Sequence, residues 1–598
     1  MKKSVCLLCI SMLSLKGYVQ EVARIVLNQA GFYPTAPKIA VLISDVNISD
    51  FFILNVKNKD TVFKGSPGIT KQSSNSSLKT QIADFTAFKV PGSYQLVIGK
   101  GQATVEFKIG PAVHRGLAVA SLKAFYFQRV SMPLAEKYAG IWARNAGHPD
   151  TTVLIHSSAA DAKKPAGTII SSPGGWYDAG DYNKYIVNSG ITMGTLMSAY
   201  EDFKTFFDTL RVEIPESGNQ IPDLLDEILY NLRWMLTMQD TNDGGVYHKC
   251  TNAAFDGNVM PGVTTLPRYA VQKSTAATLD FAAVMAQAAR IFKEYRIKLP
   301  GLDDSCLKAA KSSWTWAIKN PAVLYNQDSL NTLFKPKITT GAYGDRMPDD
   351  EWFWAASELY ITTGDGVYSD RVVAGLNSNL SLPSWAKVQM LGTYSLIRHQ
   401  KKLKEKNKGI TQNDRFLITQ KIPVIEKALL KLADNYLASL NSSAFQTVMG
   451  GRKSDFNWGS NSNAANQGIL MINAWMITRD KKYTRAALGN LDYLCGRNAT
   501  GYCFITGMGN RSPMHPHHRP STADGIVVPV PGLLAGGPNP GMQDKCRYDH
   551  TDPELAYTDD NCSYASNEIA INWNAPLVYL ANAIEAVQGE LFPVNGSK

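Results

Sequence analysis

Long apolar runs, dense clusters of charge and low-complexity segments are all scarce in this 598-residue sequence. Beyond the first 19 residues no apolar run approaches the roughly 20 residues of a membrane-spanning helix, so we expect no transmembrane segment. Charged residues make up 19% of the chain, and the net charge of +10 is spread along it. The densest basic run, residues 401–409, includes Glu405 and predicts a solvated loop rather than a nucleic-acid-binding patch. The apolar fraction of 44% excludes a fibrous or disordered chain.

The N-terminus has the layout of a secretory signal peptide. Two lysines precede an apolar stretch from Ser4 to Leu15, and polar residues follow. We therefore assign residues 1–19 to a signal peptide and expect a secreted or periplasmic protein, with the cell surface as the other option. Eight cysteines occur in all, of which Cys6 and Cys9 fall in this segment.

Six cysteines remain after the signal peptide, where an oxidising compartment would allow some to pair. We predict a disulfide between Cys546 and Cys562, because only a short loop separates them. The others are expected to be buried free thiols. They are Cys250, Cys306, Cys495 and Cys503.

The chain has two kinds of residue pattern, which predict two domains. Short apolar or alternating runs such as KIAVLIS, DFFILNV and TVEFKIG fill residues 20–110, and turn-rich pieces separate them. They predict a small antiparallel β-sandwich. Residues 111–590 instead consist of long segments with helical spacing, about ten to twelve in number. No strands alternate with these helices to make a parallel sheet, so we expect an all-α domain.

The loop WYDAGDYNKY places Asp178 and Asp181 three positions apart. Glycines around them let the backbone bend, and the neighbouring tyrosines and tryptophan supply flat apolar faces for a sugar. Such a loop could direct two carboxylates toward one small target. A calcium loop or a capped turn is the alternative interpretation.

Two further stretches carry groups that could do chemistry. Glu568 stands where a helix is expected to begin and is followed by apolar and aromatic residues, which raise the pKa of a carboxyl and suit a general acid. A helix-start glutamate favoured by the helix dipole is the alternative. The stretch HPHHRPS contains His515, His517, His518 and Arg519. Because an arginine opposes a bound cation, we interpret these side chains as hydrogen-bond donors to hydroxyls or a carboxylate rather than zinc ligands.

Together, the three stretches resemble the inverting cellulases of glycoside hydrolase family nine, over about residues 115–588. The most specific part is the C-terminal pattern of Tyr557, Asp559, Tyr564, Glu568, Ala570, Asn574 and Ala575. The segment IVLNQAGFYPTAPKIAVL resembles the immunoglobulin-like module that precedes the catalytic domain in one subgroup. The resemblance implies an immunoglobulin-like sandwich over residues 20–110 and an (α/α)6 barrel catalytic domain over residues 111–590.

The resemblance also implies a role for each site residue. Asp181 matches the general base, Asp178 its helper in holding the attacking water, and Glu568 the general acid. Asp559 matches an acid that supports the site. Contacts with substrate are implied for His517, Arg519, Tyr564 and Trp176, and Tyr247, Tyr269, Trp458 and Tyr502 are further candidate sugar platforms. An inverting pair of carboxyl groups should lie roughly 6.5 to 9.5 Å apart, which leaves room for the attacking water.

Metal sites are expected to differ from those of the subgroup. Its members often bind zinc through two cysteines and two histidines, but the matching positions here are Val130, Gly147, His148 and Tyr177, so we expect no zinc. The stretch IPESGNQIPDLLDE resembles a calcium loop, and its candidate oxygen donors are Glu216, Asn219 and Asp223. A plain helix start with Asp223 in its first turn is the alternative. Asp350 and Glu351 resemble a second calcium site more weakly.

These expectations combine into a secreted, inverting endo-1,4-β-glucanase that acts as a monomer on cellulose-like or soluble β-glucans, without an organic cofactor. The sequence shows no separate carbohydrate-binding module, which disfavours crystalline cellulose and leaves soluble glucans such as xyloglucan or mixed-linkage glucan. An exo-acting β-glucosidase or glucosaminidase on oligosaccharides is one alternative. A non-catalytic glycan-binding protein is another, which the joint presence of Asp178, Asp181 and Glu568 disfavours.

Overall fold

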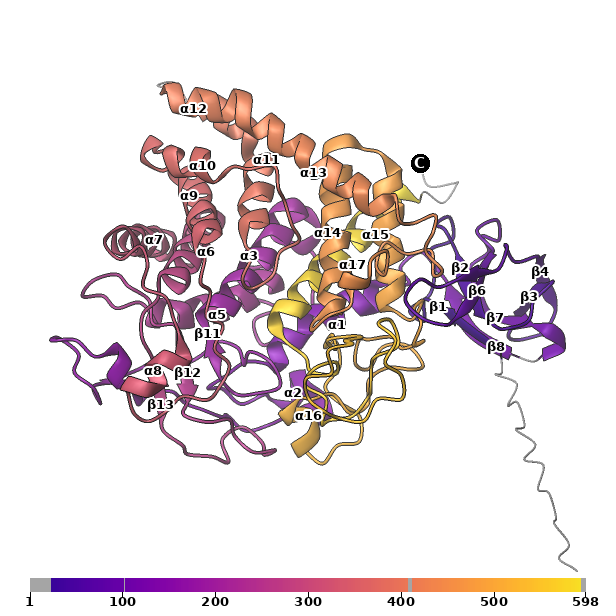
Figure 1. Cartoon of the computed structure of the whole chain (residues 1–598), viewed down its shortest axis with the longest axis horizontal. Coiled ribbons are helices and arrows are strands. Elements are labelled where there is room, and N and C mark those ends of the chain that lie inside the picture. The colour runs from indigo at the N-terminus through magenta and orange to yellow at the C-terminus, as the bar shows by residue number, and fades with distance from the viewer. Residues whose placement is uncertain (1–22, 102, 407–410, 593–598) are drawn as a thin grey trace, which may run out of the picture.

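The computed structural model describes residues 23–101, 103–406 and 411–592. The predicted signal peptide lies outside these residues. The described chain forms a small β-sandwich and a large helical barrel that pack side by side (Figure 1). No helix in the described ranges is both long and apolar enough to cross a membrane.

The sandwich consists of two four-stranded antiparallel sheets, as the alternating runs predict. One sheet has the order β1 (Arg24–Leu27), β2 (Ile39–Ile43), β6 (Lys79–Asp84), β5 (Lys71–Gln72), and the other has the order β4 (Thr61–Gly65), β3 (Phe51–Asn55), β7 (Gly92–Ile98), β8 (Ala103–Ile109). Alternate side chains point into the core, so that Phe51 and Ile53 on β3 and Leu96 and Ile98 on β7 are fully buried. Edge-to-face contacts of Phe32 with two other phenylalanines fill the core between the sheets.

Inner and outer helices alternate along the chain and build the barrel. The inner helices are α3 (Ile186–Asp202), α6 (Thr275–Phe292), α9 (Asp349–Thr363), α11 (Gln389–Lys406), α14 (Ser460–Thr478) and α17 (Ile571–Leu591), and the outer helices are α1 (Arg115–Phe127), α5 (Asp223–Thr237), α7 (Leu302–Lys319), α10 (Ser369–Gly375), α13 (Ile422–Leu437) and α15 (Lys481–Leu494). The last inner helix, α17, packs on both α14 and α3, so the ring closes. This closure brings the N-terminal and C-terminal loops of the domain together.

The inner helices are apolar on nearly every side because neighbours enclose them. Almost all residues of α6 and most residues of α14 are buried, and Trp354 of α9 is fully buried. A helix surrounded in this way needs apolar side chains around its whole circumference. Residues 401–406 of the basic run belong to the last turns of α11, which corrects the prediction of a loop there, since helical hydrogen bonding continues through this charged and solvated segment.

Short strands in the loops form a five-stranded sheet that the sequence did not predict. Its order is β10 (Ile169–Ile170), β9 (Val153–Ile155), β13 (Arg268–Ala270), β12 (Lys249–Asn252), β11 (Lys184–Tyr185), and only the β13–β9 pair is parallel. Strands of two to four residues are too short to show an alternating pattern. The sheet lies with the other loops at one end of the barrel, at the bottom of Figure 1, and β11 continues directly from the loop that holds Asp178 and Asp181.

The sandwich is joined to the barrel by buried polar contacts as well as apolar ones. The Asn28 amide donates to Asp492 at 2.6 Å, and the Tyr33 hydroxyl donates to Glu585 at 2.5 Å. The Gln29 side chain donates to the Gly501 carbonyl and accepts from two backbone amides at residues 510–511. An apolar cluster completes the interface with Val26, Val41, Ile43, Leu78, Ala444, Phe445, Ala499 and Leu555. The interface is therefore fixed in register by hydrogen bonds.

Candidate active site

Glycines shape the loop that holds the two aspartates. Gly174 and Gly175 adopt φ angles of +77° and +81°, which only glycine enters at little cost. Gly180 lies so close to the His517 backbone that a Cβ there would be 2.1 Å from the His517 carbonyl oxygen. The loop is also tied to α17, because the backbone amide of Ile571 donates to the Asp178 carbonyl at 2.8 Å. Asp178 and Asp181 are therefore held against the C-terminal segment that carries Glu568.

A cavity of about 950 Å³ opens at this end of the barrel and holds all three predicted catalytic acids. Asp178 and Asp181 line it together with Glu568, His517 and Arg519. Its aromatic lining consists of Tyr185, Phe255, Tyr343, Trp385, Trp458, Tyr564 and Trp573. Acids among aromatic faces suit a carbohydrate, because rings stack on the apolar faces of sugars while the carboxyl groups reach the bonds between them.

Asp181 has one oxygen occupied by fixed donors. Its Oδ2 accepts from the Asn183 amide at 2.5 Å and from the Tyr185 hydroxyl at 3.1 Å. The carboxylate is nearly buried, with 6% of its surface exposed, yet it lines the cavity. With Oδ2 engaged, Oδ1 is the oxygen left to accept a proton from water.

Asp178 is buried directly behind this carboxylate. Its Oδ1 accepts from Asn188 at 2.5 Å, and its Oδ2 accepts from the Tyr343 hydroxyl at 2.9 Å. Burial raises the pKa of Asp178, and the neighbouring charge of Asp181 raises it further. Asp178 therefore favours its protonated form.

Glu568 faces the aspartates from the C-terminal segment. It lies three residues before α17, in a β-bridge with His517, so it is not at the helix start that the sequence suggested. The Gly536 amide donates to its backbone carbonyl at 2.8 Å. Burial raises the pKa of the Glu568 carboxyl well above its ordinary value, and the charges of Asp181 and Asp178 act in the same direction. The surroundings of Glu568 therefore favour its protonated form.

Asp559 fixes the segment that carries His517. Its two oxygens accept from the backbone amides of Met514 and His515 at 2.8 and 2.9 Å, and Oδ1 also accepts from Asn567 at 3.1 Å. Asn567 immediately precedes Glu568, and its carbonyl accepts from the His517 amide. Asp559 thus supports the site without lining the cavity.

His517 and Arg519 line the cavity with different chemistry. The His517 Nδ1–H donates to the Asn561 carbonyl at 2.6 Å, and burial lowers its pKa, so the neutral ring presents Nε2 as an acceptor. The Arg519 guanidinium donates to the carbonyls of Gly180, Asp256 and Gly257 and joins three loops.

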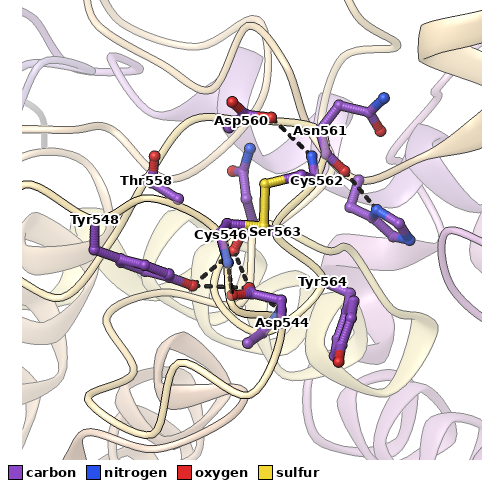
Figure 2. The surroundings of a disulfide bond; sticks show 12 residues. Asp544, Cys546, Tyr548, Thr558, Asp560, Asn561, Cys562, Ser563 and Tyr564 are labelled. Carbon is purple, nitrogen blue, oxygen red and sulfur yellow. Dashed lines mark hydrogen bonds between the residues drawn. A yellow bond between two sulfur atoms is a disulfide. The ribbon is translucent and has the colours of Figure 1, made fainter.

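The predicted disulfide between Cys546 and Cys562 is present beside the site (Figure 2). It joins the loop of Asp544 to the loop of Tyr564, and the Tyr564 hydroxyl donates to the Gln543 carbonyl at 2.9 Å. Tyr564 and Gln543 both line the cavity. The disulfide therefore restrains one wall of the site. The remaining cysteines of the described chain are buried and unpaired, as predicted.

Comparisons with known proteins agree with this geometry. The model of glycosyl hydrolase family 9 matches residues 115–581, and that of the cellulase N-terminal ig-like domain matches residues 20–103. The chain belongs to glycosyl hydrolase family 9. It is thus a glycoside hydrolase with an N-terminal immunoglobulin-like domain and the helical barrel of that family.

Two curated relatives of this family 9 chain align over nearly its whole length. It is 45% identical over 562 residues to a xyloglucan-specific endo-beta-1,4-glucanase, BoGH9A, of Bacteroides ovatus, covering 94% of this chain and 93% of the relative. It is 32% identical over 563 residues to endoglucanase D of Acetivibrio thermocellus, covering 93% of this chain and 82% of the relative. A solved structure described as Bacteroides ovatus GH9 superposes with a TM-score of 0.88 at 44% identity, over 94% of this chain and 99% of that one.

Not every predicted contact of the family 9 site lies at the cavity. Tyr564 and Trp458 line it, but Trp176 is fully buried against Phe125 and donates its indole N–H toward Glu227. This corrects the expectation that Trp176 contacts substrate, because its ring is part of the packing that holds the loop. Tyr247 is likewise fully buried.

The sequence analysis missed several cavity residues. Tyr343, Trp385 and Trp573 lie far apart in the chain and are brought together only by the folded barrel. The stretch TGAYGD around Tyr343 has the same glycine-flanked aromatic and acidic character as the Asp181 loop, which is the one signal that could have found it.

The three predicted calcium donors of the 216–223 loop each have protein partners. Glu216 accepts both guanidinium nitrogens of Arg129 at 3.0 Å, and Asn219 donates to Asp226 at 2.8 Å. Asp223 accepts from the Val212 amide and the Ser217 hydroxyl through one oxygen. Calcium binding by this set remains a prediction.

Two acidic groups in the described chain bring carboxylate oxygens within 4.8 Å of one another. The first is Asp161, Asp240 and Asp243, where the Lys273 ammonium lies 2.7 and 2.8 Å from the two latter carboxylates. A lysine thus already supplies the positive charge there.

The second group, Asp345, Asp350 and Glu351, fits a metal better. Both oxygens of Glu351 and of the fully buried Asp280 behind it have no hydrogen-bond partner, nor has Oδ2 of Asp345. Burial and the neighbouring carboxylates raise the pKa of Glu351 well above its ordinary value. Unpartnered carboxylate oxygens at the loop that carries Tyr343 are a donor set suited to a hard divalent cation.

Proposed function

We propose that this chain is a secreted, inverting endo-β-1,4-glucanase for soluble β-glucans, with Asp181 as general base and Glu568 as general acid. The observation that supports it is the presence of two carboxyl groups in different environments in one cavity. Asp181 has an oxygen free for water, whereas Glu568 is held in its neutral form. Inverting hydrolysis needs this pair on opposite faces of the sugar ring.

Each step follows from the positions of these groups. Glu568 donates its proton to the oxygen of the departing sugar, while Oδ1 of Asp181 takes a proton from the attacking water. Asp178, which accepts hydrogen bonds from Tyr343 and Asn188 and lines the same cavity, would help to hold that water. Glu568 becomes negative when it gives up its proton, and Asp181 becomes neutral when it takes one from water. The total charge of the two acids is therefore unchanged.

We further propose a decorated glucan of the xyloglucan type as the substrate. The support is the 45% identity to a relative named as xyloglucan-specific, together with aromatic residues that line the cavity on several sides, among them Phe255, Trp385 and Trp458. Phe255 and Trp458 are 47% and 44% exposed and so are available to stack on sugars.

Proton NMR of the wild-type enzyme tests mechanism and substrate together. Xyloglucan, mixed-linkage glucan and short cello-oligosaccharides would each be digested, and the anomeric signal of new reducing ends recorded before mutarotation. The proposal expects early α-anomer, fastest from xyloglucan and with a rapid fall in viscosity. Early β-anomer would refute inversion, and hydrolysis confined to short oligosaccharides from one end would replace the endo-acting mode by the exo-acting one.

We also propose that the Asp345, Asp350 and Glu351 group holds a structural calcium ion with Asp280. A ligand that binds only the folded state stabilises it by about 2.7 kcal/mol at a hundredfold excess over Kd. Calcium should therefore raise the Tm of EDTA-treated protein. Glu351→Gln should raise the Tm of metal-free protein, because an amide carries no charge that burial beside other carboxylates disfavours, and it should reduce the gain from calcium. An equal response of wild type and variant to calcium would place the ion elsewhere.

A further inference from the structure

A continuous line of hydrogen bonds connects the general base to a buried ammonium group. The Lys249 Nζ lies 3.0 Å from Thr340 Oγ1, which lies 2.6 Å from Thr251 Oγ1. Thr251 donates to Asn183 Oδ1 at 2.9 Å, and Asn183 Nδ2 donates to Oδ2 of Asp181 at 2.5 Å. All five side chains are buried. Asp181 and Asn183 come from the loop before β11, Lys249 and Thr251 from β12, and Thr340 from a third segment, and none is adjacent to another in sequence.

The two ends of this line fix the direction of every bond in it. An ammonium group only donates hydrogen bonds and an ionised carboxylate only accepts them. Thr340 must therefore accept from Lys249 and donate to Thr251. The one hydroxyl hydrogen of Thr251 has two acceptors in reach, the Asn183 side-chain carbonyl at 2.9 Å and the Asn252 backbone carbonyl at 2.8 Å, and donation to Asn183 completes the line. The Asn252 backbone amide also donates to the Asn183 side-chain carbonyl, at 2.9 Å. Only one orientation of the Asn183 amide satisfies these contacts, and it directs the NH₂ group at Asp181.

Lys249 has no carboxylate of its own within ion-pair distance among the described residues. Its Nζ donates to Gln327 Oε1 and to the Gly341 carbonyl, and it lies over the rings of Tyr185 and Tyr325. Burial lowers the pKa of Lys249 to about 7, and the charge of Asp181 acts against that shift. Asp181 is the acid whose charge favours the charged form of this lysine.

We propose that Lys249 is a positioning residue for the catalytic base and acts on Asp181 through Thr340, Thr251 and Asn183. The line holds Oδ2 of Asp181 in place, leaves Oδ1 for the water, and has a positive charge at its far end. A polarised series of hydrogen bonds is stronger than its separate members, so the effect reaches the base from the far end of the line. This inference rests on the proposed role of Asp181.

A purely structural role would give a different set of results. Lys249 also binds the Gly341 carbonyl in the loop that carries Tyr343, so its loss could simply loosen that loop. A substitution at Thr251 leaves the contact between Lys249 and Gly341 in place, because the Thr251 hydroxyl contacts Asn183, Thr340 and the Asn252 carbonyl instead. Thr251→Val keeps the shape and removes the hydroxyl, whereas Thr251→Ser keeps the hydroxyl and removes the methyl group.

The first experiment compares these two variants on soluble glucan after circular dichroism and Tm have shown that both fold. Leaving Asn183 and Thr340 without their partner should lower kcat about 10-fold to 100-fold in Thr251→Val, with KM nearly unchanged. In Thr251→Ser, kcat should fall much less than in Thr251→Val. A serine variant as poor as the valine variant, or a change confined to KM, would show that Thr251 matters for packing or binding and would overturn the inference.

The second experiment replaces the ammonium itself. Lys249→Met should move the acid limb of kcat/KM to higher pH, because the base loses a positive charge that favours its ionised form. The other groups around Lys249 are Tyr185, Tyr325 and Asp181, and the adjacent His248, whose pKa burial lowers to about 3, so that it stays neutral across the range. An unmoved acid limb with an intact fold would overturn the inference.

A double-mutant cycle separates this inference from the proposed function. In an Asp181→Asn background, which has lost the base, Thr251→Val should cause little further loss of kcat. Full additivity of the two losses would show that Thr251 does not act through Asp181. If Asp181→Asn itself retained wild-type turnover, the proposed function would fail first, independently of Lys249.

Discussion

Replacement of Glu568 by glutamine tests the assignment of the general acid most directly. The amide has nearly the shape of the protonated carboxyl, and it can still accept the hydrogen bond that the Gly180 backbone amide donates to Glu568. It is neutral, as the buried carboxylic acid is. The substitution therefore removes one property, the proton that can be given to the leaving oxygen.

The size of the loss follows from what that proton does. General acid catalysis contributes about 10²- to 10⁴-fold, which corresponds to about 3 to 5 kcal/mol of transition-state stabilisation. The loss should appear in kcat, because the amide leaves the cavity shape and its aromatic lining in place. KM and the Tm should change little.

The sharpest assay compares leaving groups. The leaving group of a natural glucan is a sugar alkoxide, which departs poorly unless it receives a proton. The leaving group of an aryl cello-oligoside is an acidic phenol, which departs as its anion without that proton. In Glu568→Gln, kcat should fall by the full factor of about 10² to 10⁴ on soluble glucan and by at most about one order of magnitude on the aryl substrate. Asp181→Asn is the matched control, since loss of the base should slow both substrates alike.

Equal losses on the two substrates in Glu568→Gln would refute this reasoning. Such a result would assign Glu568 to binding or to the orientation of water, and the acid would have to be sought among the other cavity carboxyl groups. A wild-type rate on natural glucan would remove Glu568 from the chemistry altogether.

Three other perturbations have outcomes set by the structure. Gly180→Ala places a methyl group 2.1 Å from the His517 backbone carbonyl oxygen. It should lower the free energy of unfolding by at least about 2 kcal/mol and abolish activity. A folded, active variant would contradict the contact. Joint replacement of Cys546 and Cys562 by serine opens a loop spanning 16 residues. It should lower the free energy of unfolding by up to about 3 kcal/mol, measured by thermal unfolding. An unchanged Tm would mean that the cavity wall beside the disulfide needs no restraint. Trp458→Ala should raise KM severalfold through a loss of about 1 kcal/mol or more of stacking with kcat little changed, and an effect on kcat alone would argue against a binding platform.

The sequence predicts the fold well where periodicity is strong. The alternating runs of the sandwich and the apolar helices of the ring are long enough to show a period, and the disulfide is anticipated from a short separation. The five-stranded sheet of the loops was missed because strands such as β11 have two residues. Such strands depend on partners distant in the chain, which a local pattern does not contain.

The site shows the same division. Asp178, Asp181 and Glu568 lie in stretches with recognisable residue types, and the structure brings all three to one cavity. Trp176 was assigned to the substrate because it stands beside the aspartates in sequence, but a buried loop needs an anchor and this ring serves as one. Lys249 has no local pattern at all, since its connection with Asp181 exists only after β11 and β12 pair.

The docking of the sandwich limits how freely this enzyme could be rearranged. Asn28 and Tyr33 are the hydrogen-bond partners of Asp492 and Glu585, two nearly buried carboxyl groups on the barrel. A barrel expressed without the sandwich would keep those acids and lose their partners. Gln29 would also no longer bind the backbone at residues 510–511, which precedes the histidines at 515–518. The immunoglobulin-like domain is therefore not an interchangeable module. Exchange of either domain between relatives would succeed only when these complementary residues are inherited together, so the two domains constrain each other's evolution as parts of one catalytic unit.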